Sequence, residues 1–121
     1  MIVLPKYVQK AWGHELWIHN SPEYCGKLLV FNKGSEFSMH FHLIKEETWY
    51  VSSGEFEFNW FDTEAAIRLT MKLKQGDVIN LKQGIPHKLK ALSQDATIFE
   101  VSTEHYDSDS YRIEPGDSQK A

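Results

Sequence analysis

Cysteine is almost missing from this sequence, because Cys25 is the only one. A single cysteine cannot form an internal disulfide, which favours a reducing cytoplasmic setting. No apolar run approaches the roughly 20 residues that a membrane-spanning helix needs. The first ten residues, MIVLPKYVQK, place a proline and lysines where a signal peptide would continue its apolar stretch. We therefore expect a cytoplasmic protein without a membrane partner.

An excess of positive charge is also missing, since 13 Lys and Arg stand against 17 Asp and Glu. Nucleic-acid binding needs a clustered cationic surface, so we expect no nucleic-acid partner. The sequence shows no long repeat, low-complexity tract or amphipathic helix. Its 121 residues predict a single domain over 1–121 with its own core. We expect an N-terminal arm over 1–24, a core over about 25–103, and a polar tail over 104–121 that is solvated or covers a dimer partner.

What the sequence does contain is a series of short strand-like segments separated by turn signals. They cover 26–32, 36–43, 47–53, 55–61, 66–73, 78–81, 87–92 and 96–103. Segment 26–32 alternates little, so we expect burial on both of its faces. Ser53 and Gly54 lie between two such segments and predict a hairpin. Many short strands with regular turns favour an all-β sandwich or barrel.

Histidines are concentrated where the alternation is clearest. In an extended strand His40 and His42 project to the same face, Glu47 follows on the next strand, and His87 comes much later in a loop. Three imidazoles and one carboxylate suit a single divalent transition metal, with Zn, Mn, Fe and Ni all compatible. Glu46 competes with Glu47, but alternation with Trp49 favours Glu47. The alternative is a buried polar network without metal, which would be costly to bury unpaired.

The spacing around these residues resembles the cupin superfamily. Gly34, His40, His42, Glu47 and Gly54 match its first signature in order and spacing. The second signature is matched by Gly76, Gly84 and His87, with Lys82 at the family's proline and Ala91 at its asparagine. The resemblance implies a double-stranded β-helix, the jelly-roll barrel of cupins, with metal held by the four residues named above. It also implies a homodimer.

A second likeness, to the cupin domain of type II mannose-6-phosphate isomerases, runs over most of residues 12–114. It rests on the following residues and short motifs: Trp12-Gly13, Lys27, Ser38, Glu47-x-Trp49, Ile85 to Leu89, Glu100-Val101, and Tyr106 to Arg112. The metal loop departs from that family, because it reads His-Phe-His-Leu-Ile-Lys-Glu. The likeness implies a sugar or sugar phosphate as the ligand, and an aldose–ketose isomerase as the activity. The candidate substrate-binding residues are Trp49, Lys27, Ser38 and Arg112.

An isomerase also needs a general base near the substrate carbon. The candidates are Glu57, His105 and Glu15, although alternation places Glu57 on the face opposite Phe56 and Phe58. Two other functions remain open. The same four ligands suit an Fe(II)-dependent cupin dioxygenase, and the lack of an obvious base favours a non-catalytic sugar-binding or regulatory cupin.

Overall fold

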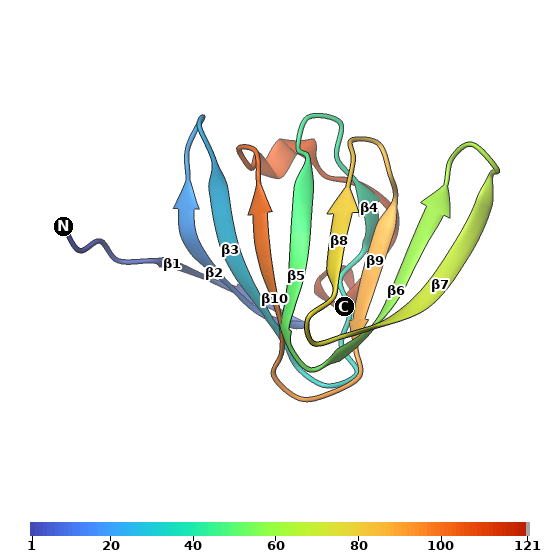
Figure 1. Ribbon diagram of the computed structural model, residues 1–121, viewed down its shortest axis with the longest axis horizontal. Helices are drawn as coiled ribbons and strands as arrows, with labels where there is room; N and C mark the ends of the chain where they lie inside the picture. Colours follow the sequence, from blue (N-terminus) through green and yellow to red (C-terminus); the bar gives the residue numbers. More distant parts are fainter. Residues whose placement is uncertain (121) are drawn as a thin grey trace.

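The computed structural model describes residues 1–120, which form two antiparallel sheets facing one another (Figure 1). The six-stranded sheet has the order β1-β2-β3-β10-β5-β8, and the five-stranded sheet has the order β11-β4-β9-β6-β7. The strands are β1 (Lys6–Lys10), β2 (Gly13–Asn20), β3 (Cys25–Phe31), β4 (Met39–Phe41), β5 (Glu47–Ser53), β6 (Glu55–Asp62), β7 (Ile67–Lys74), β8 (Val78–Leu81), β9 (His87–Ala91), β10 (Ala96–Ser102) and β11 (Tyr111–Glu114). The predicted all-β jelly-roll architecture is confirmed. None of residues 1–120 lies in a helix long and apolar enough to cross a membrane.

The predicted hairpin at Ser53 and Gly54 is wrong, because the chain changes sheet there. β5 pairs with β10 and β8, whereas β6 pairs with β7 and β9. Gly54 has φ +79°, and a Cβ there would lie 2.8 Å from the Cα of Ala96. Glycine is needed for this tight crossing between sheets. The hairpin in this region is instead β6–β7 (Figure 1).

Both ends of the chain add strands to the barrel. In the segment expected as an N-terminal arm, β2 pairs with β3 and β1 pairs with β2. The tail needs a correction, because residues 104–120 are not simply a solvated segment. They contain two 3-10 helices, η1 (Asp107–Asp109) and η2 (Asp117–Gln119), and β11, which pairs with β4. The polar composition of the tail did not predict this strand and these short helices, because the tail contacts residues that are far away in the sequence.

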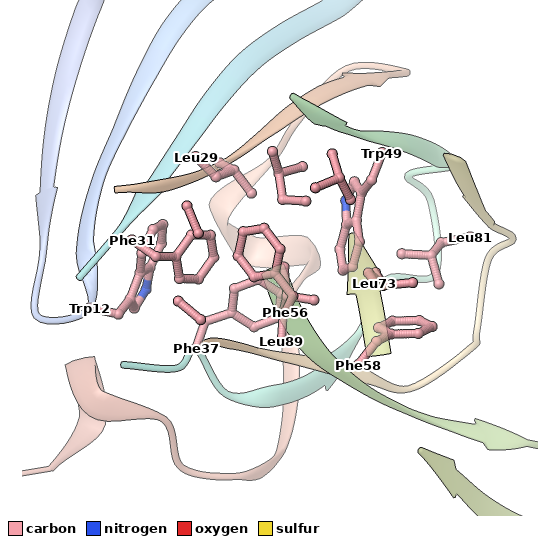
Figure 2. Close-up of a cluster of buried hydrophobic side chains, with 14 residues drawn as sticks. Trp12, Leu29, Phe31, Phe37, Trp49, Phe56, Phe58, Leu73, Leu81 and Leu89 are labelled. Atoms are coloured by element: carbon pink, nitrogen blue, oxygen red, sulfur yellow. The ribbon is translucent and has the colours of Figure 1, made fainter. Parts of the chain in front are cut away.

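The hydrophobic core fills one end of the space between the sheets. Trp12 stacks on Phe31 with ring centroids 4.4 Å apart, and Phe56 meets Phe31 edge to face at 5.1 Å (Figure 2). Figure 2 shows Leu73 and Leu81 at the other side of the same cluster. Aromatic side chains therefore hold the two sheets together at this end and leave the other end free for polar groups.

β3 is buried on one face only, so the prediction of burial on both faces is wrong. Its alternate residues Lys27, Leu29 and Phe31 face inward, while Leu28 and Val30 stay partly exposed. Leu28 belongs to a row of directly paired apolar side chains that crosses the outer face of the whole sheet. This outer row consists of Tyr7, Leu16, Leu28, Phe99, Tyr50 and Val78. Weak alternation in the sequence therefore reflects an apolar outer surface.

Candidate metal centre

Three histidines from two neighbouring strands of the five-stranded sheet meet inside the barrel. His40 lies on β4 directly opposite His87 at the start of β9, and His42 follows immediately after β4. One nitrogen from each ring lies within 4.8 Å of the others. Glu47, the first residue of β5, reaches them from the other sheet, with Oε2 3.2 Å from His42 Nε2 and 4.0 Å from His87 Nε2. The structure thus brings together the four ligands that the sequence predicts.

Backbone carbonyls fix how each histidine is oriented. His40 Nδ1 lies 2.7 Å from the carbonyl oxygen of Ser38, and His42 Nδ1 lies 2.7 Å from that of Asp109. His87 Nδ1 lies 2.9 Å from the carbonyl oxygen of Ile85. A carbonyl oxygen only accepts, so each Nδ1 carries the proton and donates it. Each Nε2 therefore keeps its lone pair for a metal, as second-shell hydrogen bonds commonly arrange for ligating histidines.

Glu47 is held at one oxygen and unsatisfied at the other. Trp49 Nε1 donates to Glu47 Oε1 at 2.6 Å. Glu47 Oε2 and His87 Nε2 are buried and have no hydrogen-bond partner within residues 1–120. Unsatisfied buried polar atoms of this kind are costly, and a cation between them would remove the cost. Glu46, the competing candidate, instead accepts from Lys82 Nζ at 2.9 Å near the surface.

The protonation states also suit a cation. Burial lowers the pKa of His87 to about 4, and burial together with His87 and His42 lowers the pKa of His40 well below its usual value. Burial acts to raise the pKa of Glu47, but Lys45 and His42 outweigh it and hold that pKa well below its usual range. At neutral pH these residues therefore present neutral imidazoles and a carboxylate, which are the forms that bind a divalent metal.

The metal centre lies in a cavity of about 510 Å³. Its walls come from the inner face of β1, β2, β3, β5 and β10 on one side, and from β4, β9 and the C-terminal segment on the other. A volume of this size is typical of sites for small molecules. The site is therefore a buried cluster that could hold a metal ion, with room beside it for a small molecule.

Comparison with known proteins identifies the family. The family model for the cupin domain matches residues 27–104, which is more than half of the chain. The chain belongs to the cupin family. A search of curated protein sequences finds no match for this cupin.

Solved structures share the fold at low sequence identity. Oxalate decarboxylase from Bacillus subtilis superposes with a TM-score of 0.79 at 16% identity, over 90% of this cupin and 30% of that chain. The capsular polysaccharide assembling protein CapF from Staphylococcus aureus gives 0.76 at 16% identity, over 93% of this cupin and 33% of that chain. KdgF from Halomonas sp. superposes with a TM-score of 0.73 at 17% identity, over 85% of this cupin and 89% of that chain. This cupin thus spans about a third of the first two proteins and most of the third. The finer likeness to type II mannose-6-phosphate isomerases stays a prediction.

Most of the residues singled out in the sequence line the cavity. They are Trp49, Lys27, Ser38, Arg112, His105 and Glu15. Glu57 does not line it, and its carboxylate accepts from Asn59 Nδ2 on the opposite face of β6. Trp49 is only 1% exposed, so its main contact with the site is the hydrogen bond to Glu47. Ser38 contacts His40 through both its carbonyl and its hydroxyl.

Lys27 and Glu15 form one pair on the cavity wall. Lys27 Nζ lies 3.7 Å from Glu15 Oε1 and 4.1 Å above the ring of Trp17, whose Nε1 donates to the same carboxylate oxygen at 2.8 Å. Burial lowers the pKa of Lys27. Glu15 Oε2 makes no hydrogen bond in the part of the cupin that the structure describes. Glu15 therefore presents one uncommitted oxygen on the cavity wall.

A buried lysine connects the metal centre to this wall, and sequence reasoning missed it. Lys45 is 4% exposed, and its Nζ lies 3.7 Å from Glu47 Oε2 and 3.4 Å from Glu100 Oε2. The same ammonium lies 3.3 Å from His105 Nδ1, while His105 Nε2 lies 2.9 Å from Asp107 Oδ1. His105 thus has both ring nitrogens engaged. A signal for Glu100 was present, because it follows Ala96 and Ile98 on the buried face of segment 96–103.

Asp109 is the second residue that was missed. Its carboxylate accepts from the backbone N–H groups of Leu43, Ile44 and Lys45 at 2.9 to 3.2 Å, and its carbonyl accepts from His42. These bonds hold the loop between two candidate ligands. Asp109 is 3% exposed although it lies in the polar tail. The C-terminal segment therefore helps to shape the metal loop.

Proposed function

We propose that this cupin is a metal-dependent aldose–ketose isomerase acting on a sugar or sugar phosphate. The observation that carries the proposal is the buried, unsatisfied Glu47 oxygen beside three clustered histidines, each bonded to a backbone carbonyl through Nδ1, in a cavity of about 510 Å³. Neutral imidazoles and a carboxylate bind divalent transition metals, and the cavity has room for a monosaccharide.

His40, His42, His87 and Glu47 would hold the metal, with Zn, Mn, Fe and Ni all compatible with these donors. When bound, the metal supplies a Lewis acid that polarises a carbonyl of an α-hydroxy carbonyl substrate. Trp49 fixes Glu47 by its hydrogen bond to Oε1, and the three backbone carbonyls fix the imidazoles. The ligands are therefore oriented before any metal binds, which lowers the cost of binding.

Isomerisation moves a proton from one carbon of the substrate to its neighbour, with no net oxidation. Among the three candidate bases, Glu15 fits this task best, because it lines the cavity and one of its oxygens is uncommitted. Lys27 and Trp17 hold its other oxygen in place. His105 has both nitrogens engaged, and Glu57 lies outside the cavity. In this proposal Glu15 takes the proton from the first carbon and returns it to the second.

The test is proton exchange on metal-loaded protein. Incubation with aldose phosphates such as mannose 6-phosphate in D₂O should give the ketose and introduce deuterium at its C1, the carbon that receives the proton, as followed by NMR. Glu15→Gln should lower this rate by about 100-fold or more, the range usual for loss of a general base. It should keep its metal, and Glu23→Gln, on an exposed loop, should match the wild type.

Other outcomes would replace the proposal. Oxygen uptake by the iron-loaded protein, without deuterium exchange, would favour the cupin dioxygenase. A rise in melting temperature with sugars, with neither exchange nor oxygen uptake, would favour a sugar-binding or regulatory cupin.

We also propose that the cupin forms a homodimer through the outer row. Tyr7, Phe99, Tyr50 and Val78 of this row are 38–58% exposed, which is unusual for an unbroken apolar row across a sheet. Met1 to Leu4 extend away from the edge strand β1 and are 73–118% exposed (Figure 1). A second copy related by a two-fold axis would place the same row against itself and bring the apolar segment onto its surface.

A further inference from the structure

Three cations line the cavity from two edge strands that belong to different sheets. Lys6 and Lys10 lie on β1, and Arg112 lies on β11. Lys6 is the register partner of Trp17, and Arg112 is the register partner of His40. Directly paired residues of antiparallel strands point to the same face, so both cations lie on the inner side of their sheets. We call Lys6, Lys10 and Arg112 the rim cations.

The rim cations differ from the other cations of the cavity in having no acidic partner. Lys27 is paired with Glu15, and Lys45 with Glu47 and Glu100. Across residues 1–120, no carboxylate lies within 4.0 Å of Lys6 Nζ, Lys10 Nζ or the Arg112 guanidinium. Lys6 Nζ lies 4.6 Å from the Trp17 ring, a cation–π contact that directs it toward the cavity. Three cations at one cavity therefore make no ion pair with a carboxylate among the described residues.

We propose that the rim cations bind the phosphate group of a sugar phosphate whose carbonyl end lies at the metal centre. A phosphate monoester carries a charge of about −1.5 to −2 at neutral pH, which two lysines and an arginine can balance. Arginine offers a planar fork to two phosphate oxygens, and lysines act as point charges. The inference rests on the proposed function, since it names the substrate class of the same cavity. A carboxylate at the same end of the sugar is the other source of such an oxyanion.

The test compares three ligands that differ in the group at C6: mannose with a hydroxyl, mannose 6-phosphate with a phosphate, and mannuronate with a carboxylate. Their affinities for the metal-loaded protein, with inorganic phosphate as a fourth probe, are measured by calorimetry at two salt concentrations. Lys6→Gln/Lys10→Gln/Arg112→Gln removes the rim cations, and Lys33→Gln removes an exposed cation outside the cavity. Thermal unfolding of both variants checks that the fold is intact.

We expect mannose 6-phosphate to bind wild type and Lys33→Gln about tenfold or more tightly than mannose, because charge-assisted hydrogen bonds to phosphate are stronger than those to a neutral hydroxyl. This advantage should fall at high salt and vanish in the triple variant. Equal binding of the two sugars by wild type, an advantage that survives in the triple variant, or no binding of any anion would overturn the inference. Tighter binding of mannuronate than of mannose 6-phosphate would replace phosphate with carboxylate. Phosphate-selective binding without isomerisation would leave the inference standing and remove only the proposed activity.

Discussion

Two neighbouring rows of side chains cross the six-stranded sheet on opposite faces, and the inner row carries charges while the outer row is entirely apolar. The inner row consists of Lys6, Trp17, Lys27, Glu100, Trp49 and Ile79. The outer row, one residue away on every strand, consists of apolar side chains that are partly or largely exposed. Sheets with one solvated face normally place apolar side chains inward. Here the inner row borders the cavity, where Lys27 and Glu100 have ion-pair partners and Lys6 has none within residues 1–120, while the outer row leaves apolar side chains exposed.

This comparison shows what alternation in a sequence does and does not predict. Alternation correctly places Lys27, Leu29 and Phe31 on one face of β3. Leu28 and Val30 are apolar as well, so the sequence alone does not show that they face outward. The meeting of the candidate ligands His40, His42, Glu47 and His87 could be predicted, because strand alternation and the spacing of the glycine turns bring them together. The contacts of Lys45 with Glu100 and of Asp109 with the metal loop could not be predicted, because these partners are 55 to 67 residues away in the sequence. Contacts over such separations are decided by the fold and carry no local signal.

The largest effect on the inner side should follow from breaking its buried ion pairs. Lys45→Met leaves Glu47 and Glu100 buried without their shared ammonium. Removing one partner of a buried pair costs about 3–5 kcal/mol, so urea unfolding of the metal-free variant should show a loss in this range. Added Zn²⁺ should recover part of the loss, because a metal also balances Glu47. Lys72→Met, which removes an exposed pair with Glu55, serves as the control. A loss of unfolding free energy no larger than in this control would show that Lys45 does not stabilise the buried carboxylates of Glu47 and Glu100.

On the outer side, a single charge should separate the two copies. Phe99→Glu places a carboxylate at the centre of the outer row, where a two-fold axis would bring it close to its counterpart. We expect the dissociation constant of the dimer to rise by about 30-fold or more, which corresponds to about 2 kcal/mol at an interface hot spot. Sedimentation over a range of concentrations measures this change. A wild-type protein that stays monomeric over the whole range of concentrations would contradict the proposal that a second copy covers the outer row.

The smallest effect concerns the response of the cavity wall to pH. Burial, with Lys27 and Lys45 nearby, lowers the pKa of His105 from 6.5 to about 4. Between pH 6.5 and about 4, His105 binds a proton in the unfolded chain but not in the folded protein. The contribution of His105 to the free energy of unfolding is therefore fully present above pH 6.5 and is lost as the pH falls toward 4. His105→Gln should therefore lessen the fall in unfolding free energy over this range, as measured by urea titrations of the metal-free protein. His14→Gln, outside the cavity, should keep the wild-type slope; an equal slope in both variants would contradict the placement of His105.

The central claim is that His40, His42, His87 and Glu47 form a metal centre. Its most direct test is the metal content of the untagged protein by elemental mass spectrometry, beside His42→Ala and a control, His19→Ala, which changes a histidine stacked on Tyr24 outside the cavity. The account predicts near-stoichiometric divalent transition metal in wild type and control, and its loss in His42→Ala. Wild-type protein that stays free of metal after reconstitution with Zn²⁺, Mn²⁺, Fe²⁺ and Ni²⁺ would contradict it.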